Sequence, residues 1–108
     1  MVIDFNKITE KEVDGFKGGN GPFHTRCADD GKVKIMYNTL LPGSSIGLHT
    51  HEVDFEVMYV LKGELTFIAD GKEETAQAGC VHYCPQGMAH TAVNRTDKPV
   101  TFFAVVAK

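Results

Sequence analysis

The sequence predicts an all-β protein, either a sandwich or a barrel. Glycine and proline interrupt the chain about every ten residues, which is the spacing of turns between short strands. The intervening runs are rich in valine, isoleucine, tyrosine, phenylalanine and threonine, residue types that favour extended backbone. No segment after Lys11 carries apolar residues at helical spacing over the roughly 11 residues that such a pattern needs.

Turn signals set the bounds of the expected strands. Pro42 and Gly43 end one strand, and an acidic turn over residues 52–54 separates the next two. Asp70 and Gly71 form a hairpin signal, because both residue types tolerate the positive φ that a tight turn requires. The expected strands cover residues 23–28, 33–41, 46–51, 56–61, 65–69, 72–76, 80–84, 90–95 and 99–107.

The two ends of the chain differ in pattern. Residues 10–22 are expected to form a turn-rich lead-in, and the four glycines within residues 15–22 argue against a helix there. The last strand is apolar on both faces over residues 102–106. Such a strand is either central in its sheet or covered by a partner subunit.

The composition fits one domain spanning residues 1–108. A chain of 108 residues can bury one hydrophobic core without disulfide support. The net charge is -3 and lysine and arginine do not cluster, so we expect no nucleic-acid partner. No apolar run approaches the roughly 20 residues that span a bilayer, so we expect no membrane insertion. Residues 1–10 lack the apolar stretch of a signal peptide, and we therefore expect a cytoplasmic protein.

The three cysteines do not suggest a disulfide framework. Their number is odd, and Cys27 lies far from Cys80 and Cys84 in the sequence. Cys80 and Cys84 resemble a metal-binding pair only loosely. We expect buried, reduced thiols that pack as small apolar side chains.

Four residues have the chemistry and spacing of a metal site. His49 and His51 lie two apart on an expected strand, so their imidazoles project from the same face. Glu56 begins the next strand and can fold back beside them, and His90 can join the group when a barrel closes. Three imidazoles and one carboxylate suit Mn, Fe, Co, Ni, Cu or Zn better than Mg or Ca, which prefer oxygen ligands.

These residues belong to two ordered motifs. The segment 43–63 reads G-x5-H-x-H-x4-E-x6-G, and the segment 79–94 reads G-x5-P-x-G-x2-H-x3-N. Together they resemble the two signature motifs of the cupin superfamily, with all ten defined positions present and 15 residues between the motifs. The chain is therefore identified as a candidate small cupin of the conserved-barrel type.

The resemblance implies a jelly-roll barrel, also called a double-stranded β-helix, made of two antiparallel sheets. It implies that His49, His51, Glu56 and His90 bind one divalent transition-metal ion. An octahedral ion held in this way keeps two open positions, as a catalytic site requires. Asn94, the last motif position, is expected to hold a turn or backbone group rather than to touch the ion.

Other polar residues are candidates for contact with a ligand. If they face the cavity, His82 and Cys84 are candidates for substrate contact or proton transfer; the alternative for His82 is a packed or surface histidine. His24 and Arg26 share one strand face and could reach the cavity mouth, where an arginine could bind a carboxylate or phosphate. The alternative for that pair is an exposed edge strand.

Strand alternation leaves the cavity lining open. Tyr37 is a second candidate for proton transfer if it faces inward, and Glu74 is a third. The turn acids Glu52 and Asp54 are expected to be solvated. A set of aromatic and thioether residues either lines the cavity or belongs to the core: Met36, Tyr37, Met58 and Tyr59.

Two functions of different classes fit these observations. The first is a metal-dependent enzyme that acts on a small polar metabolite as a dioxygenase, a decarboxylase or a sugar or keto-acid isomerase. The second is a non-catalytic protein that uses the metal to bind or sense a small molecule, and a metal-free structural relic is a third reading. Because similar one-domain cupins commonly pair through strand surfaces, the resemblance also implies a homodimer.

Overall fold

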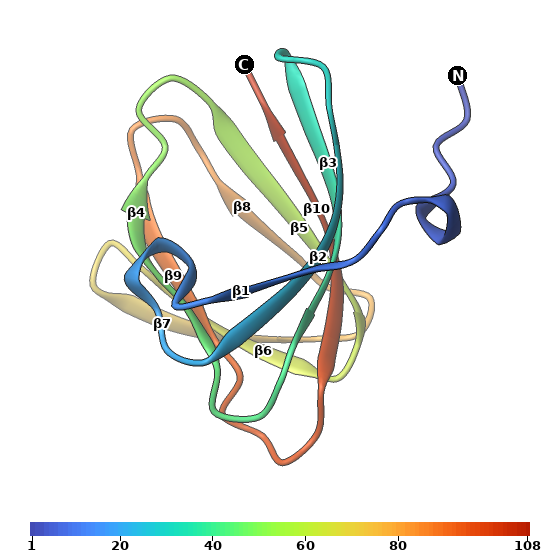
Figure 1. Ribbon diagram of the computed structural model, residues 1–108. Helices are drawn as coiled ribbons and strands as arrows, with labels where there is room; N and C mark the ends of the chain where they lie inside the picture. The colour runs from blue at the N-terminus through green and yellow to red at the C-terminus, as the bar shows by residue number, and fades with distance from the viewer.

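The computed structural model describes all 108 residues and contains two antiparallel sheets that face one another (Figure 1). One sheet has the strand order β1-β2-β3-β10-β5-β8, and the other has the order β4-β9-β6-β7. The strands are β1 (Lys11–Asp14), β2 (Pro22–Asp29), β3 (Val33–Leu40), β4 (Ser45–Thr50), β5 (Phe55–Lys62), β6 (Glu64–Ala69), β7 (Lys72–Gln77), β8 (Val81–Cys84), β9 (Ala89–Val93) and β10 (Val100–Ala107). The predicted all-β jelly-roll class is confirmed.

The lead-in segment holds elements that the sequence pattern does not predict. Strand β1 is short and mostly exposed, and it exists because it pairs along its length with β2. Two single turns of 3-10 helix, η1 (Phe5–Lys7) and η2 (Phe16–Gly18), complete the fold. Lys17 within η2 has φ 57°, a left-handed conformation. No helix is long and apolar enough to cross a membrane.

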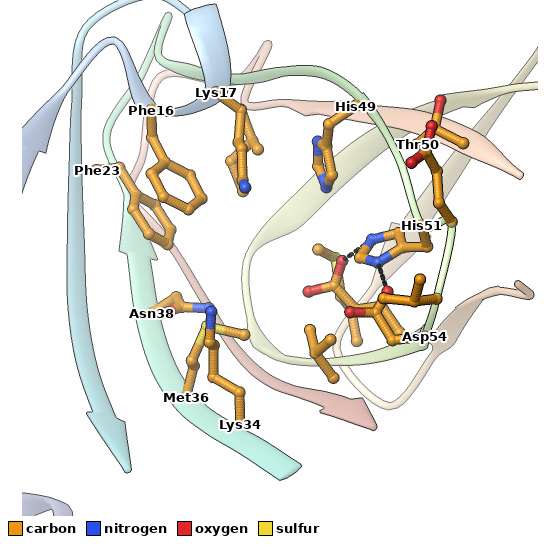
Figure 2. Close-up of a pocket in the computed structure, with 16 residues that line it drawn as sticks. Phe16, Lys17, Phe23, Lys34, Met36, Asn38, His49, Thr50, His51 and Asp54 are labelled. Atoms are coloured by element: carbon orange, nitrogen blue, oxygen red, sulfur yellow. Dashed lines mark hydrogen bonds and ion pairs between the residues drawn. The ribbon is translucent and has the colours of Figure 1, made fainter. Parts of the chain in front are cut away.

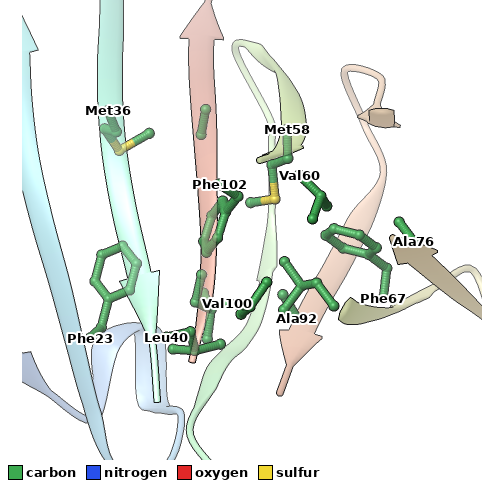
Figure 3. Close-up of a cluster of buried hydrophobic side chains, with 13 residues drawn as sticks. Phe23, Met36, Leu40, Met58, Val60, Phe67, Ala76, Ala92, Val100 and Phe102 are labelled. Atoms are coloured by element: carbon green, nitrogen blue, oxygen red, sulfur yellow. The ribbon is translucent and has the colours of Figure 1, made fainter. Parts of the chain in front are cut away.

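The hydrophobic core lies between the two sheets (Figure 3). Leu40 of β3 and Phe102 of β10 are fully buried, and so is Leu65 of β6 in the facing sheet. Each such side chain contributes roughly 1.5–3 kcal/mol by leaving water. This packing fixes the spacing of the sheets.

Turn chemistry follows the sequence closely. Asp70 and Gly71 both have positive φ, at 51° and 72°, as the predicted hairpin requires. Asn94 is fully buried and its amide donates to the carbonyl oxygens of Leu40 and Lys98. Asn94 therefore ties two turns together, as expected.

A bulge in β4 shapes the entrance to the barrel. Pairing between β4 and β9 shifts between Ile46 and His49, so these residues both line the interior although they lie three apart. Gly47, within the bulge, touches the backbone of η2 so closely that a side chain there would collide with the carbonyl of Lys17. Strand β4 and η2 are thus packed backbone to backbone.

The outer face of the larger sheet is apolar around β10. Strand β10 lies between β3 and β5, so it is central in its sheet, the first of the two explanations for its apolar pattern. Outward-facing residues of β10 pair in register with apolar or aromatic residues of the neighbouring strands, which forms two rows across the sheet. These rows are Tyr37–Phe103–Tyr59–Val81 and Ile35–Val105–Val57–Tyr83.

Candidate metal centre

The two sheets bring four predicted ligands together at one end of the barrel. His49 on β4 pairs in register with His90 on β9, and His51 follows directly after β4. Glu56 reaches the same point from β5 in the other sheet. One donor atom from each residue lies within 4.8 Å of the other three.

The donor atoms have the spacing of ligands around one ion. Oε1 of Glu56 lies 3.0 Å from Nε2 of His51 and 3.0 Å from Nε2 of His90. Nε2 of His90 lies 3.1 Å from that of His51 and 3.2 Å from that of His49. Two ligands at right angles, each about 2.1 Å from an ion, are separated by about 3.0 Å. The residues present therefore fit a transition-metal ion.

The outer nitrogen of each imidazole has its own partner. Nδ1 of His49 donates to the carbonyl oxygen of Gly47 at 2.8 Å, and Nδ1 of His51 donates to Asp54 at 2.7 Å. Nδ1 of His90 lies 3.0 Å from Nε2 of His82. When the imidazoles carry their protons on Nδ1, as metal ligands do, their Nε2 lone pairs face one another and the carboxylate of Glu56. A cation among them relieves this repulsion, as in metal sites whose histidines are oriented by outer partners.

The titration behaviour of the site agrees with its donor chemistry. Burial acts to raise the pKa of Glu56, but hydrogen bonds with His51 and His90 outweigh it and lower the pKa to about 2. The hydrogen bond with Glu56 raises the pKa of His51, and Asp54 adds to the effect. Burial lowers the pKa of His49. The carboxylate is thus ionised at neutral pH and attracts either a proton or a metal ion.

An open cavity of about 270 Å³ adjoins the four donor groups (Figure 2). Its apolar lining residues are Phe16, Phe23, Met36, Ile46, Val53, Met58 and Val106. Its polar lining residues, besides three of the ligands, are Lys17, Lys34, Asn38, Thr50, Glu52 and Asp54. A small molecule can therefore approach the ion position from this side.

Comparison with known proteins settles the family. A sequence profile described as a cupin domain matches residues 36–106. The chain belongs to the cupin family. The resemblance of the two motifs to those of the cupin superfamily is thereby confirmed.

Individual cupins match the whole chain. An oxalate-binding protein of Thermotoga maritima is 33% identical over 98% of this chain and 93% of its own length. The crystal structure of a predicted oxalate decarboxylase from Thermotoga maritima is 32% identical, has a TM-score of 0.92, and covers 99% of this chain and 98% of its own. A sugar phosphate isomerase of Silicibacter pomeroyi shares the fold at 24% identity and a TM-score of 0.82, over 100% of this chain and 76% of its own.

Two candidates for acid-base chemistry lie behind or outside the cavity of this cupin. The ring of His82 stacks on Phe67 at a centroid distance of 4.0 Å and is held against His90. Burial lowers the pKa of His82 to about 4, so this ring is neutral and accepts a hydrogen bond at neutral pH. Tyr37 faces the outer side of the sheet, where its ring packs against Phe5.

The predicted ligand contacts on β2 also lie elsewhere. His24 lies between Glu10 and Glu12, with ring nitrogens 3.4 and 3.3 Å from their carboxylates. Arg26 donates to two backbone carbonyls of the N-terminal segment. Neither residue lines the cavity, because Phe23 takes the inward face of β2 and these side chains have the opposite parity.

The cysteines differ from one another in exposure. Cys84 is buried as expected, its thiol donates to the carbonyl of Met88, and burial raises its pKa to about 11. Cys27 and Cys80 are exposed, which corrects the expectation of three buried thiols. All three are free, and none belongs to the metal centre.

Several residues of the site were not predicted from the sequence. Asp54 was expected to be solvated, yet its carboxylate orients His51. The spacing of three residues between Asp54 and His51 was the available signal, because such a pair closes easily across a turn.

The third candidate for proton transfer, Glu74, lies exposed on β7, away from the cavity. Lys17, Lys34 and Asn38 carry no local signal, since only the fold brings them to the cavity.

Proposed function

We propose that this cupin binds a small dicarboxylate through a resident divalent transition-metal ion, and that oxalate is the first ligand to test. The observation that carries the proposal is the convergence of three Nε2 atoms and one carboxylate oxygen beside an open cavity. The likeness to the oxalate-binding protein of Thermotoga maritima supports the choice of ligand.

His49, His51, Glu56 and His90 would hold the ion. When bound, it supplies a Lewis-acid centre whose remaining positions accept carboxylate oxygens. Mn, Fe, Co, Ni, Cu and Zn all suit three imidazoles and one carboxylate. Two lysines, Lys17 and Lys34, also line the cavity. Their positive charges favour an anionic ligand.

The lining of the cavity favours binding over turnover. Of the residues considered for proton transfer, His82 is held by His90 and Tyr37 lies on the outer face. Neither of these two residues therefore lines the cavity.

Decarboxylation is the second candidate, and the carboxyl group of Glu52 favours it. Glu52 lines the cavity, is exposed and forms no ion pair within the protein. In this reaction the carbon–carbon bond of the oxalate dianion breaks, one carbon leaves as carbon dioxide, and the other keeps the bonding electrons and takes up one proton to give formate. Glu52 is placed to supply that proton, and the likeness to the predicted oxalate decarboxylase of Thermotoga maritima supports testing the reaction.

Calorimetry tests oxalate binding, and assays of metal content and formate release test the ligand set and decarboxylation. Protein stripped of metal and reloaded with Mn²⁺ should bind oxalate, and stripped protein should not. Glu56→Gln should lose metal far more readily than the matched variant Glu52→Gln, because only Glu56 lies among the donor atoms. Equal metal retention in the two variants removes Glu56 from the site. Formate released by loaded protein, and lost in Glu52→Gln, establishes decarboxylation.

We also propose that the protein is a homodimer that pairs through the outer face of the larger sheet. Tyr59, Val81 and Tyr83 on this face are 40%, 55% and 58% exposed. Adjacent exposed apolar side chains of this kind mark an interaction surface. Light scattering should give twice the chain mass for the wild type and for Thr75→Asp, a control on the other sheet, but the chain mass for Tyr59→Asp. A monomeric wild type contradicts the proposal.

A further inference from the structure

The cavity has a second polar wall that the metal ligands do not use. Asn38 of β3 lines the cavity and is 2% exposed, its side-chain oxygen is buried without a hydrogen-bond partner, and its NH₂ group, the part that can donate to a carboxylate, forms no hydrogen bond within the protein either. Thr25, its register partner on β2, also has a buried hydroxyl without a partner. Buried amides and hydroxyls are hydrogen-bonded in nearly all folded proteins. Of the two residues only Asn38 lines the cavity, so its amide is the group that a ligand can meet.

Asn38 faces the metal centre across the cavity. Figure 2 shows its side chain opposite His49 and His51, with the space of the cavity between them. Lys34 lies four residues earlier on the same strand, so it shares the inward parity of Asn38. Lys17 enters from η2. A ligand bound to the ion therefore has hydrogen-bond donors in front of its far end.

The cavity has charges of both signs. The carboxylates of Glu52, Asp54 and Glu56 lie on β5 and the turn before it, close to the metal centre. The cations Lys17 of η2 and Lys34 of β3 also line the cavity, and neither forms an ion pair within the protein. Free cations beside a buried amide suit a carboxylate, because hydrogen bonds to a charged acceptor are the stronger ones.

We infer that the ligand is a dicarboxylate longer than oxalate, with one carboxylate at the ion and the second received by Asn38 and Lys34. This inference rests on the proposed function and extends it to the far end of the ligand. A cavity of about 270 Å³ has the volume of about nine water molecules at about 30 Å³ each, more than oxalate fills. The intervening walls include Met36, Met58 and Ile46, which suit the methylene groups between two carboxylates.

Matched pairs of acids test the far end alone. Malate and 2-hydroxybutyrate present the same chelating hydroxy acid and differ only in a distal carboxylate or methyl group. The pair 2-hydroxyglutarate and 2-hydroxypentanoate repeats the comparison with one more carbon. Calorimetry of the Mn²⁺-loaded protein should give tighter binding of the diacid in at least one pair, by roughly tenfold, the size of one charge-assisted hydrogen bond.

Variants assign that preference to residues. Asn38→Leu and Lys34→Gln should each reduce the ratio of diacid to monoacid affinity several-fold, because each variant removes one hydrogen bond to the distal carboxylate. Lys32→Gln is the matched control, because it removes the same charge from a residue that does not line this cavity. Ligand-free Asn38→Leu should melt no lower than the wild type, since it replaces an unpartnered buried amide with an apolar group of similar size.

Each result has a distinct meaning. Failure of the loaded wild type to bind oxalate or any of the acids overturns the proposed function and this inference with it. Binding of oxalate without preference for the diacid in either pair overturns this inference alone. An equal loss of preference in Lys32→Gln indicates a general charge effect and overturns the inference. A lower melting temperature of Asn38→Leu shows that Asn38 has a structural role and also overturns the inference.

Discussion

Replacing His82 with phenylalanine should weaken metal binding although His82 is not itself a ligand. Its Nε2 lies 3.0 Å from Nδ1 of His90 and accepts a hydrogen bond from the N–H group that His90 has there when His90 presents its own Nε2 to an ion. Phenylalanine removes the acceptor but keeps an aromatic ring to stack on Phe67. The hydrogen bond is therefore the main interaction that the substitution removes.

The magnitude follows from the burial of His90, whose exposed fraction is 1%. Without His82, the metal-binding tautomer of His90 buries an unpaired N–H group, at a cost of about 1–3 kcal/mol. The metal-free imidazole avoids this cost by moving its proton to Nε2, which lies 3.0 Å from Glu56. The penalty thus falls on the metal-bound state, and the dissociation constant should rise roughly 10- to 100-fold.

Competition calorimetry against a chelator of known affinity measures this change. His24→Phe is the matched control, because His24 contacts only Glu10 and Glu12 among charged groups and lies outside the cavity. It should leave the metal dissociation constant unchanged. If His82→Phe and His24→Phe agree within about twofold, the contact between His82 and His90 does not orient the ligand, and the reasoning fails.

Three further outcomes can be measured on the wild type. Chelation should lower the melting temperature, because an ion at roughly 1,000 times its dissociation constant stabilises the folded state by about 4 kcal/mol; an unchanged value after verified metal loss contradicts this. Metal affinity should be highest at alkaline pH and fall as pH drops through the pKa of His51, which Glu56 raises above 6.5 in the metal-free protein. Constant affinity between about pH 8 and 6 contradicts the assignment of His51. In a thiol titration Cys27 and Cys80 should react in the native protein, whereas Cys84, whose pKa burial raises to about 11, should react only after unfolding.

The residues that were predictable from the sequence are those whose role is encoded locally. Alternation and turn residues predicted most of the strands, as at Asp70 and Gly71, because the backbone conformation depends on those residues alone. The spacing of the two motifs singled out four residues that the fold brings within 4.8 Å of one another. Strand β1 could not be found in this way, since its polar residues become a strand only by pairing with β2.

Alternation also defines two faces without saying which is inward. Met36 and Met58 line the cavity, whereas Tyr37 and Tyr59 lie on the outer face. Both pairs of residues follow the same two-residue alternation along their strands, and only the packing between the sheets determines which pair faces inward. The bulge after Ile46 in β4 likewise changes the parity, and no single residue indicates it.

The placement of the donor groups has a mechanical consequence. Three of them come from β4, β9 and the residue after β4, and Glu56 alone comes from the opposing sheet. An ion bound to all four therefore joins the two sheets at the open end of the barrel, in addition to the hydrophobic core between them. Amide hydrogens around this rim should exchange more slowly in the loaded protein than in the stripped protein, while those of the core strands exchange alike.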